Sequence, residues 1–102
     1  MGLEIVVPRP GPCPLGPVLD ALAAAGLPST VAMVDNALRP AEAPPPDEWR
    51  DVRLRTPAGM VALRRHAGGV AVVVFGNADA ALQAAQRAVA EAVRSAPDRR
   101  VD

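Results

Sequence analysis

VRLRTPAGMVALRRHAGGVAVVVF, residues 52–75, is the stretch of sequence that decides the fold. It contains three runs with strand character, at 52–56, 61–66 and 70–75, and each break between them is rich in turn residues. Alternation of apolar and polar side chains is typical of a half-buried strand, and glycine between such runs is typical of a tight turn. The stretch therefore predicts three consecutive antiparallel strands.

The apolar and basic side chains of this stretch predict how the strands pair. Placing Thr56 opposite Val61 brings Leu54 opposite Leu63, and the second turn then brings Leu63 opposite Val74. A slip by one residue would mix the two faces, so this register is favoured. One face is left for the core. The other face collects three apolar and three basic side chains: Ala62, Val73, Phe75, Arg53, Arg55 and Arg64.

The N-terminal third predicts a strand, a helix and a second strand. Residues 3–7 form a short apolar run that is typical of a strand buried on both faces. Pro17 suits the first turn of a helix, and Gly26 suits the cap that ends it near residue 25. Residues 30–34 are rich in β-formers and are expected to form the next strand.

The remaining segments complete a two-layer α+β sandwich of order β-α-β, proline-rich loop, β-β-β, α. The loop spans 36–50, and Trp49 near its end is expected to cover a thin aliphatic core. Asn77 is expected to cap the last helix, which Pro97 ends. We expect one domain over residues 1–97, with residues 98–102 as a frayed tail.

Composition excludes several classes of function. The chain has 102 residues, a net charge of zero and one cysteine. Zero net charge provides no field to attract nucleic acid or an anionic membrane. No apolar run approaches the ~18 residues of a membrane span, and the N-terminus lacks the basic end of a signal peptide. One cysteine excludes an internal disulfide, and no metal-ligand spacing or cofactor motif occurs. We expect a cytoplasmic protein, and basic positions that are all Arg indicate a bacterial source.

Cys13 precedes the first helix, and a helix N-terminus stabilises a thiolate. Around it, the strand Ile5-Val6-Val7, the stretch Arg9-Pro10-Gly11-Pro12-Cys13-Pro14, the segment Ala25-Gly26-Leu27-Pro28 and the pair Val34-Asp35 resemble the opening of thioredoxin-like proteins, glutaredoxins especially. The resemblance implies a thioredoxin-like fold as the alternative architecture, and Thr56-Pro57 could correspond to that family's cis-proline beside the reactive Cys. The second redox cysteine is replaced by Gly16, so dithiol exchange is excluded and only a monothiol role falls to Cys13.

Three functions remain open. The first is a non-catalytic module that associates through the open side of the sheet, most simply as a homodimer, because the 70–75 strand is apolar on both faces. Acids at 47, 48 and 51 are then expected to meet the arginine rim across the dimer. The second is a monothiol redox enzyme that uses Cys13. The third is a small-molecule-binding domain that uses a cleft beside the 8–17 loop. The sequence favours a protein that is not an enzyme and that binds no nucleic acid or membrane.

Overall fold

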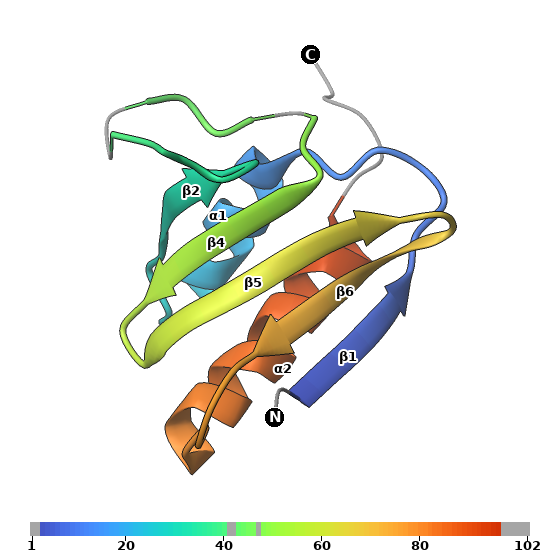
Figure 1. Ribbon diagram of the computed structural model, residues 1–102. Coiled ribbons are helices and arrows are strands. Elements are labelled where there is room, and N and C mark those ends of the chain that lie inside the picture. The colour runs from blue at the N-terminus through green and yellow to red at the C-terminus, as the bar shows by residue number, and fades with distance from the viewer. Residues whose placement is uncertain (1–2, 41–42, 47, 97–102) are drawn as a thin grey trace.

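The computed structural model describes residues 3–40, 43–46 and 48–96. In chain order its elements are β1 (Leu3–Pro8), α1 (Leu15–Ala24), β2 (Thr30–Val34), β3 (Ala37–Leu38), β4 (Asp51–Thr56), β5 (Gly59–His66), β6 (Gly69–Val74) and α2 (Ala80–Ser95). The strands of the described chain form one antiparallel sheet in the order β1-β6-β5-β4-β2-β3, and both helices lie against one of its faces (Figure 1). A small α+β domain is thus confirmed. The tail predicted at 98–102 lies outside the described residues.

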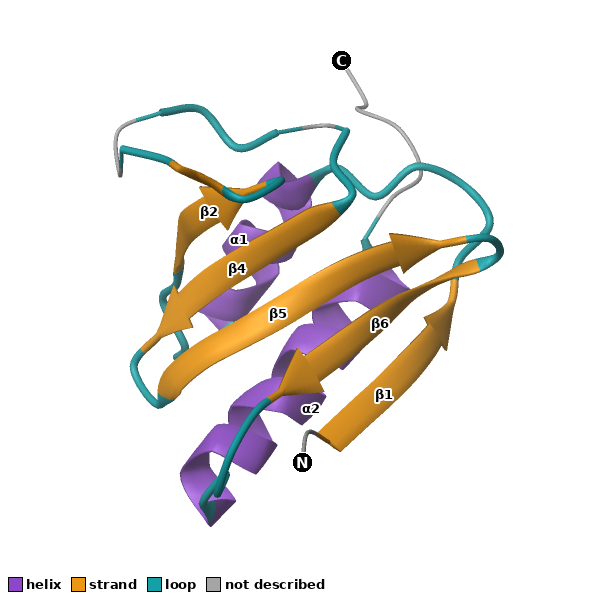
Figure 2. Ribbon diagram, in the orientation of Figure 1, coloured by secondary structure: helices purple, strands orange, loops and turns teal. Residues whose placement is uncertain are grey.

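The first strand occupies one edge of the sheet. β1 pairs with β6, so that Leu3 lies opposite Val74 and Val7 lies opposite Val70. β1 and β2 run in the same direction but have three strands between them, and α1 crosses behind the sheet to connect them (Figure 2). Because the helices cover one face only, Val6 is 49% exposed on the other face. The prediction of a strand buried on both faces is wrong.

The proline-rich segment begins with a strand that the predicted order lacks. Asp35 and Asn36 both adopt positive φ, at 50° and 68°, and form the turn between β2 and the two-residue β3. Asp and Asn tolerate this conformation, which a two-residue hairpin turn with matching twist requires at both central positions. The chain therefore reverses at once after β2 and adds a short edge strand before the prolines.

Both later hairpins are tighter than predicted. Thr56 pairs with Gly59, and Leu63 pairs with Val72, so the predicted pairs of Thr56 with Val61 and of Leu63 with Val74 are wrong by two residues. The Thr56 hydroxyl closes the first turn: it donates to the Gly59 carbonyl at 2.7 Å, and Gly59 has a φ of +136°. A shift of two residues leaves every side chain on its predicted face.

The core fills the space between the sheet and the helices. It consists of aliphatic side chains with almost no exposure, chiefly Val7, Leu15, Val18, Leu22, Val52, Leu54, Val61, Leu63, Val70, Val72, Val74, Val89 and Val93. Trp49 is buried beside them, as predicted. Gln86, which is also buried, donates through Nε2 to the carbonyls of Leu3 and Val72, both at 3.0 Å. This side chain joins α2 to the edge of the sheet.

The helix ends are set by local polar contacts. Gly26 follows α1 with a φ of +83°, as its predicted cap role requires. α2 is capped by Asp79, whose carboxylate accepts from the Leu82 N–H at 2.8 Å. The prediction of Asn77 as the cap is wrong, because the helix begins at Ala80 and its first free N–H groups lie within reach of Asp79. No helix within the described residues is long and apolar enough to cross a membrane.

Candidate functional site

All six predicted interface residues lie on the face of the sheet away from the helices. Arg53 pairs with Ala62, and Ala62 pairs in turn with Val73, while the core residues alternate with them along each strand. We call this surface the open face. On β1, β4, β5 and β6 and just beyond, it comprises Glu4, Val6, Asp51, Arg53, Arg55, Met60, Ala62, Arg64, Ala71, Val73 and Phe75.

The open face carries three large apolar side chains, one each on β1, on β5 and just after β6, with the charged Glu4 among them. Its large side chains are substantially exposed: Val6 at 49%, Met60 at 40% and Phe75 at 48%. Beneath them, three small side chains form a separate buried cluster, namely Ala62, Ala71 and Val73. The exposed apolar surface of this face therefore comes from the three large side chains, because the small ones beneath them are almost fully buried.

The charges of the open face fall into two groups. Arg64 is engaged within the chain, because its Nε lies 3.4 Å from a carboxylate oxygen of Asp51 and its guanidinium lies over the Phe75 ring, 5.5 Å from the centroid. Arg53 and Arg55 have no acidic partner within the described residues. Glu4 lies at the other end of the same row as Arg53, since Glu4 pairs with Val73. Sequence reasoning missed Glu4 because it did not place β1 beside β6.

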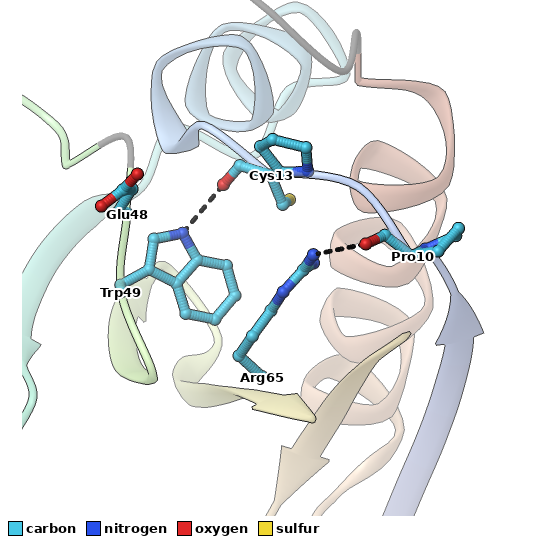
Figure 3. A pocket seen from close by; sticks show the side chains of 6 residues that line it. Pro10, Cys13, Glu48, Trp49 and Arg65 are labelled. Carbon is cyan, nitrogen blue, oxygen red and sulfur yellow. Dashed lines mark hydrogen bonds between the residues drawn. The ribbon is translucent and has the colours of Figure 1, made fainter. Parts of the chain in front are cut away.

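A second candidate region is a cavity of about 330 Å³, which lies where β1 and β5 end and β4 begins. It is lined by Pro10, Pro12, Cys13, Glu48, Trp49 and Arg65 (Figure 3). The loop between β1 and α1 forms one wall, and the start of β4 and the end of β5 form the other. The Cys13 side chain points between the Trp49 ring and the Arg65 guanidinium (Figure 3). This is the cleft beside the 8–17 loop that the third of the open functions, a small-molecule-binding domain, would use.

The surroundings of Cys13 keep its thiol protonated. The side chain is 3% exposed, and burial raises its pKa above the ordinary value of 9.0, although the positive charges of Arg9 and Arg65 oppose the shift. The alternative of a monothiol redox enzyme depends on a thiol whose pKa the start of α1 lowers. The thiol therefore lacks the lowered pKa that reactive cysteines have. It packs in the core cluster with Trp49 as a small apolar side chain.

A buried arginine holds the loop that carries Cys13. Arg9 is 5% exposed, and it donates to the carbonyls of Val93 at 2.8 Å and Ala96 at 2.6 Å, at the end of α2. The same guanidinium donates to the Pro12 carbonyl at 2.9 Å through Nε and 2.6 Å through Nη2. The opposite wall contributes the Trp49 indole, whose Nε1–H donates to the Cys13 carbonyl at 2.8 Å. The cavity wall is thus fixed from both sides.

Pro57, which was compared with the thioredoxin-like cis-proline, does not line the Cys13 cavity. No cis peptide bond occurs in the described chain, and Pro57 lies in the turn between β4 and β5. There it lines a different cavity, formed with the end of α1 and the start of α2. Thr56-Pro57 therefore does not correspond to a cis-proline beside Cys13, because Pro57 lies in the two-residue turn of the β4–β5 hairpin. The thioredoxin-like alternative is not confirmed.

Sequence reasoning also missed Arg9 and Arg65. The alternation of β5 does place Arg65 on the helix-side face, opposite to Arg64, and this pattern could have identified it. His66 is exposed at the end of the same strand. Among the described residues, no group of three or more His, Cys, Asp or Glu side chains could hold a metal ion. No family model, curated protein or solved structure matches this chain.

Proposed function

We propose that this protein is a non-catalytic module that associates with a second copy of itself through the open face. The observation that carries the proposal is the exposure of Val6, Met60 and Phe75 together on one face of the sheet. The helices cover the other face only, so in a single chain these side chains meet water. An apolar centre beside arginines is the usual composition of a protein interface.

The strand register supports a second copy as the partner. A row of four side chains crosses the open face at one level: Glu4, Val73, Ala62 and Arg53. An acid stands at one end, a base stands at the other, and the two apolar side chains lie between them. A twofold axis parallel to the strands, between β5 and β6, exchanges the two ends of this row. Each Glu4 then faces the partner's Arg53, while the buried Val73 and Ala62 form the floor beneath the contact.

The same axis also sets the neighbouring rows, and in one of them it places Asp51 opposite the partner's Val6. Continuing the β5–β6 register places Phe75 beside Met60, so these two side chains also exchange across the axis. Arg64 brings its own counter-charge, because it is paired with Asp51 in the same chain. Two of the acids that were first expected to meet the partner's arginines do not enter the proposed contact. Glu48 lines the Cys13 cavity, and residue 47 lies outside the described chain. Glu4 takes their place as the acid of the interface.

Replacement of Phe75 by Asp tests the proposal. Phe75→Asp puts a charge at the apolar centre, so we expect sedimentation equilibrium to show a dimer for the wild type and a monomer for the variant. Leu38→Asp is the matched control, because Leu38 is 85% exposed on β3, outside the overlap of the two faces. Circular dichroism checks that both variants fold. A wild type that is monomeric at high micromolar concentration would exclude the proposal.

A further inference from the structure

The cavity beside Cys13 contains an arginine whose hydrogen-bonding capacity is only partly used. Nη2 of Arg65 donates to the Gly11 carbonyl and lies 3.5 Å from the Pro10 carbonyl oxygen. Nη1 is buried and has no hydrogen-bond partner in the structure. A buried N–H without an acceptor is costly, and more so when the group carries a charge. Arg65 therefore has an unused donor next to the cavity that it lines.

The charge of Arg65 is also uncompensated. No acidic side chain of the described residues lies within ion-pair distance of it, although Glu48 lines the same cavity. Its two contacts are neutral carbonyl groups, which accept hydrogen bonds but leave the positive charge in place. A partly buried guanidinium of this kind favours an anionic ligand.

The lining selects a carboxylate in preference to a phosphate. A carboxylate carries a single negative charge, which matches the single arginine of the cavity and its unused nitrogen, Nη1. A phosphate needs more donors, and the loop is poor in them because Pro10, Pro12 and Pro14 have no N–H group. The carboxylate of Glu48 on the opposite wall would also repel a second negative charge.

The remaining walls fit an apolar body. The Trp49 ring and the prolines at 10 and 12 present apolar surface, and about 330 Å³ is enough for a small organic molecule. The Trp49 N–H is already used by the Cys13 carbonyl, so the indole offers packing only. Because Arg9 and Trp49 hold the loop in place, little ordering would be needed on binding.

We propose that this cavity binds a small organic acid, with its carboxylate paired to Arg65 and its apolar body packed against Trp49. The site is separate from the open face: Arg65 lies on the helix-side face of β5, whereas its neighbour Arg64 lies on the open face. Binding is therefore independent of self-association.

Trp49 provides the measurement, because it is the only tryptophan in the chain. We would titrate the full-length protein with benzoate and with benzamide, its uncharged analogue of the same shape, and follow the tryptophan fluorescence. We expect a saturable change with benzoate in the millimolar range or below, and binding of benzamide weaker by tenfold or more. Equal binding of the two compounds, or no saturable response to benzoate, would overturn the proposal.

Arginine variants locate the carboxylate. Arg65→Met is expected to weaken benzoate binding by tenfold or more, whereas Arg87→Met, at an exposed position of α2, should bind benzoate like the wild type. Arg65→Lys keeps the charge but loses the planar pair of donors, so an intermediate affinity is expected. Unchanged binding by a folded Arg65→Met variant would overturn the assignment to Arg65. If that variant does not fold, Arg65→Lys and the benzoate–benzamide comparison on the wild type decide the question.

Discussion

Cys13 is a thiol that the fold keeps protonated. Its pKa lies above the ordinary value of 9.0 because burial disfavours the thiolate, while the unfolded chain exposes the same group to water. Below about pH 8 the thiol is protonated in both states, so its contribution to stability is fully present. As the pH rises above 9, the unfolded chain releases the proton first and is stabilised relative to the folded chain.

We therefore expect the free energy of unfolding of the wild type, relative to that of Cys13→Ala, to be constant below about pH 8 and to fall as the pH rises above 9. Urea unfolding at a series of pH values measures the difference. The buried thiol should also react with a disulfide reagent far more slowly in the native protein than in urea. A difference that stays constant through pH 10.5, or fast labelling of the native thiol, would contradict this account.

Single residues also explain where the sequence-based prediction failed. Alternation placed Ala62, Val73, Phe75 and the three arginines on one face, because the faces depend only on odd and even positions. The register depends on turn length, which Thr56 and Gly59 determine through a side-chain hydrogen bond and a positive φ. A residue-type pattern does not contain that information.

At the scale of elements, Arg9 connects the loop before α1 to the end of α2. Its guanidinium satisfies carbonyls at the C-terminus of the helix, where a positive charge is also favoured by the helix dipole. Arg9→Met would leave the Val93 and Ala96 carbonyls without this donor. We expect urea unfolding to show a loss of about 2–4 kcal/mol. Arg87→Met, at an exposed position of the same helix, should change stability by less than about 0.5 kcal/mol. Equal effects of the two substitutions would contradict this role.

The helices and strands themselves were largely predictable from the sequence, but the pairing of strands that lie far apart in the chain was not. Helical spacing and the glycine after residue 25 identified α1, and the turn residues within 52–75 separated three strands. The pairing of β1 with β6 joins segments from opposite ends of the chain, and no local pattern encodes it. Because Glu4 lies on β1, the acidic end of the proposed interface was missed with it. The cleft beside the 8–17 loop was named, but Arg65 was missed as part of its lining for the same reason, since the cavity needs three separate segments.

At the scale of the whole molecule, exchange of charges tests the proposed symmetry axis. Glu4→Arg or Arg53→Glu alone puts like charges together at both ends of the dimer, and each should weaken association by about tenfold, or ~1.4 kcal/mol. The double variant restores opposite charges and should return to within about threefold of the wild type. Sedimentation at two salt concentrations measures the effect. If Phe75→Asp separates the copies but the double variant is weaker than either single one, the face is right and the axis is wrong.

The edge position of β1 affects the order in which the chain can fold. The hairpins from β4 to β6 join near neighbours in sequence, so their closure costs little chain entropy, whereas β1 closes the longest loop in the sheet. During translation, β1 is made well before its partner strand β6. The nascent chain must then keep an apolar strand unpaired, and Pro8 at its end limits pairing with other chains. Folding of the described sheet therefore finishes with the strand that precedes all its others in the chain.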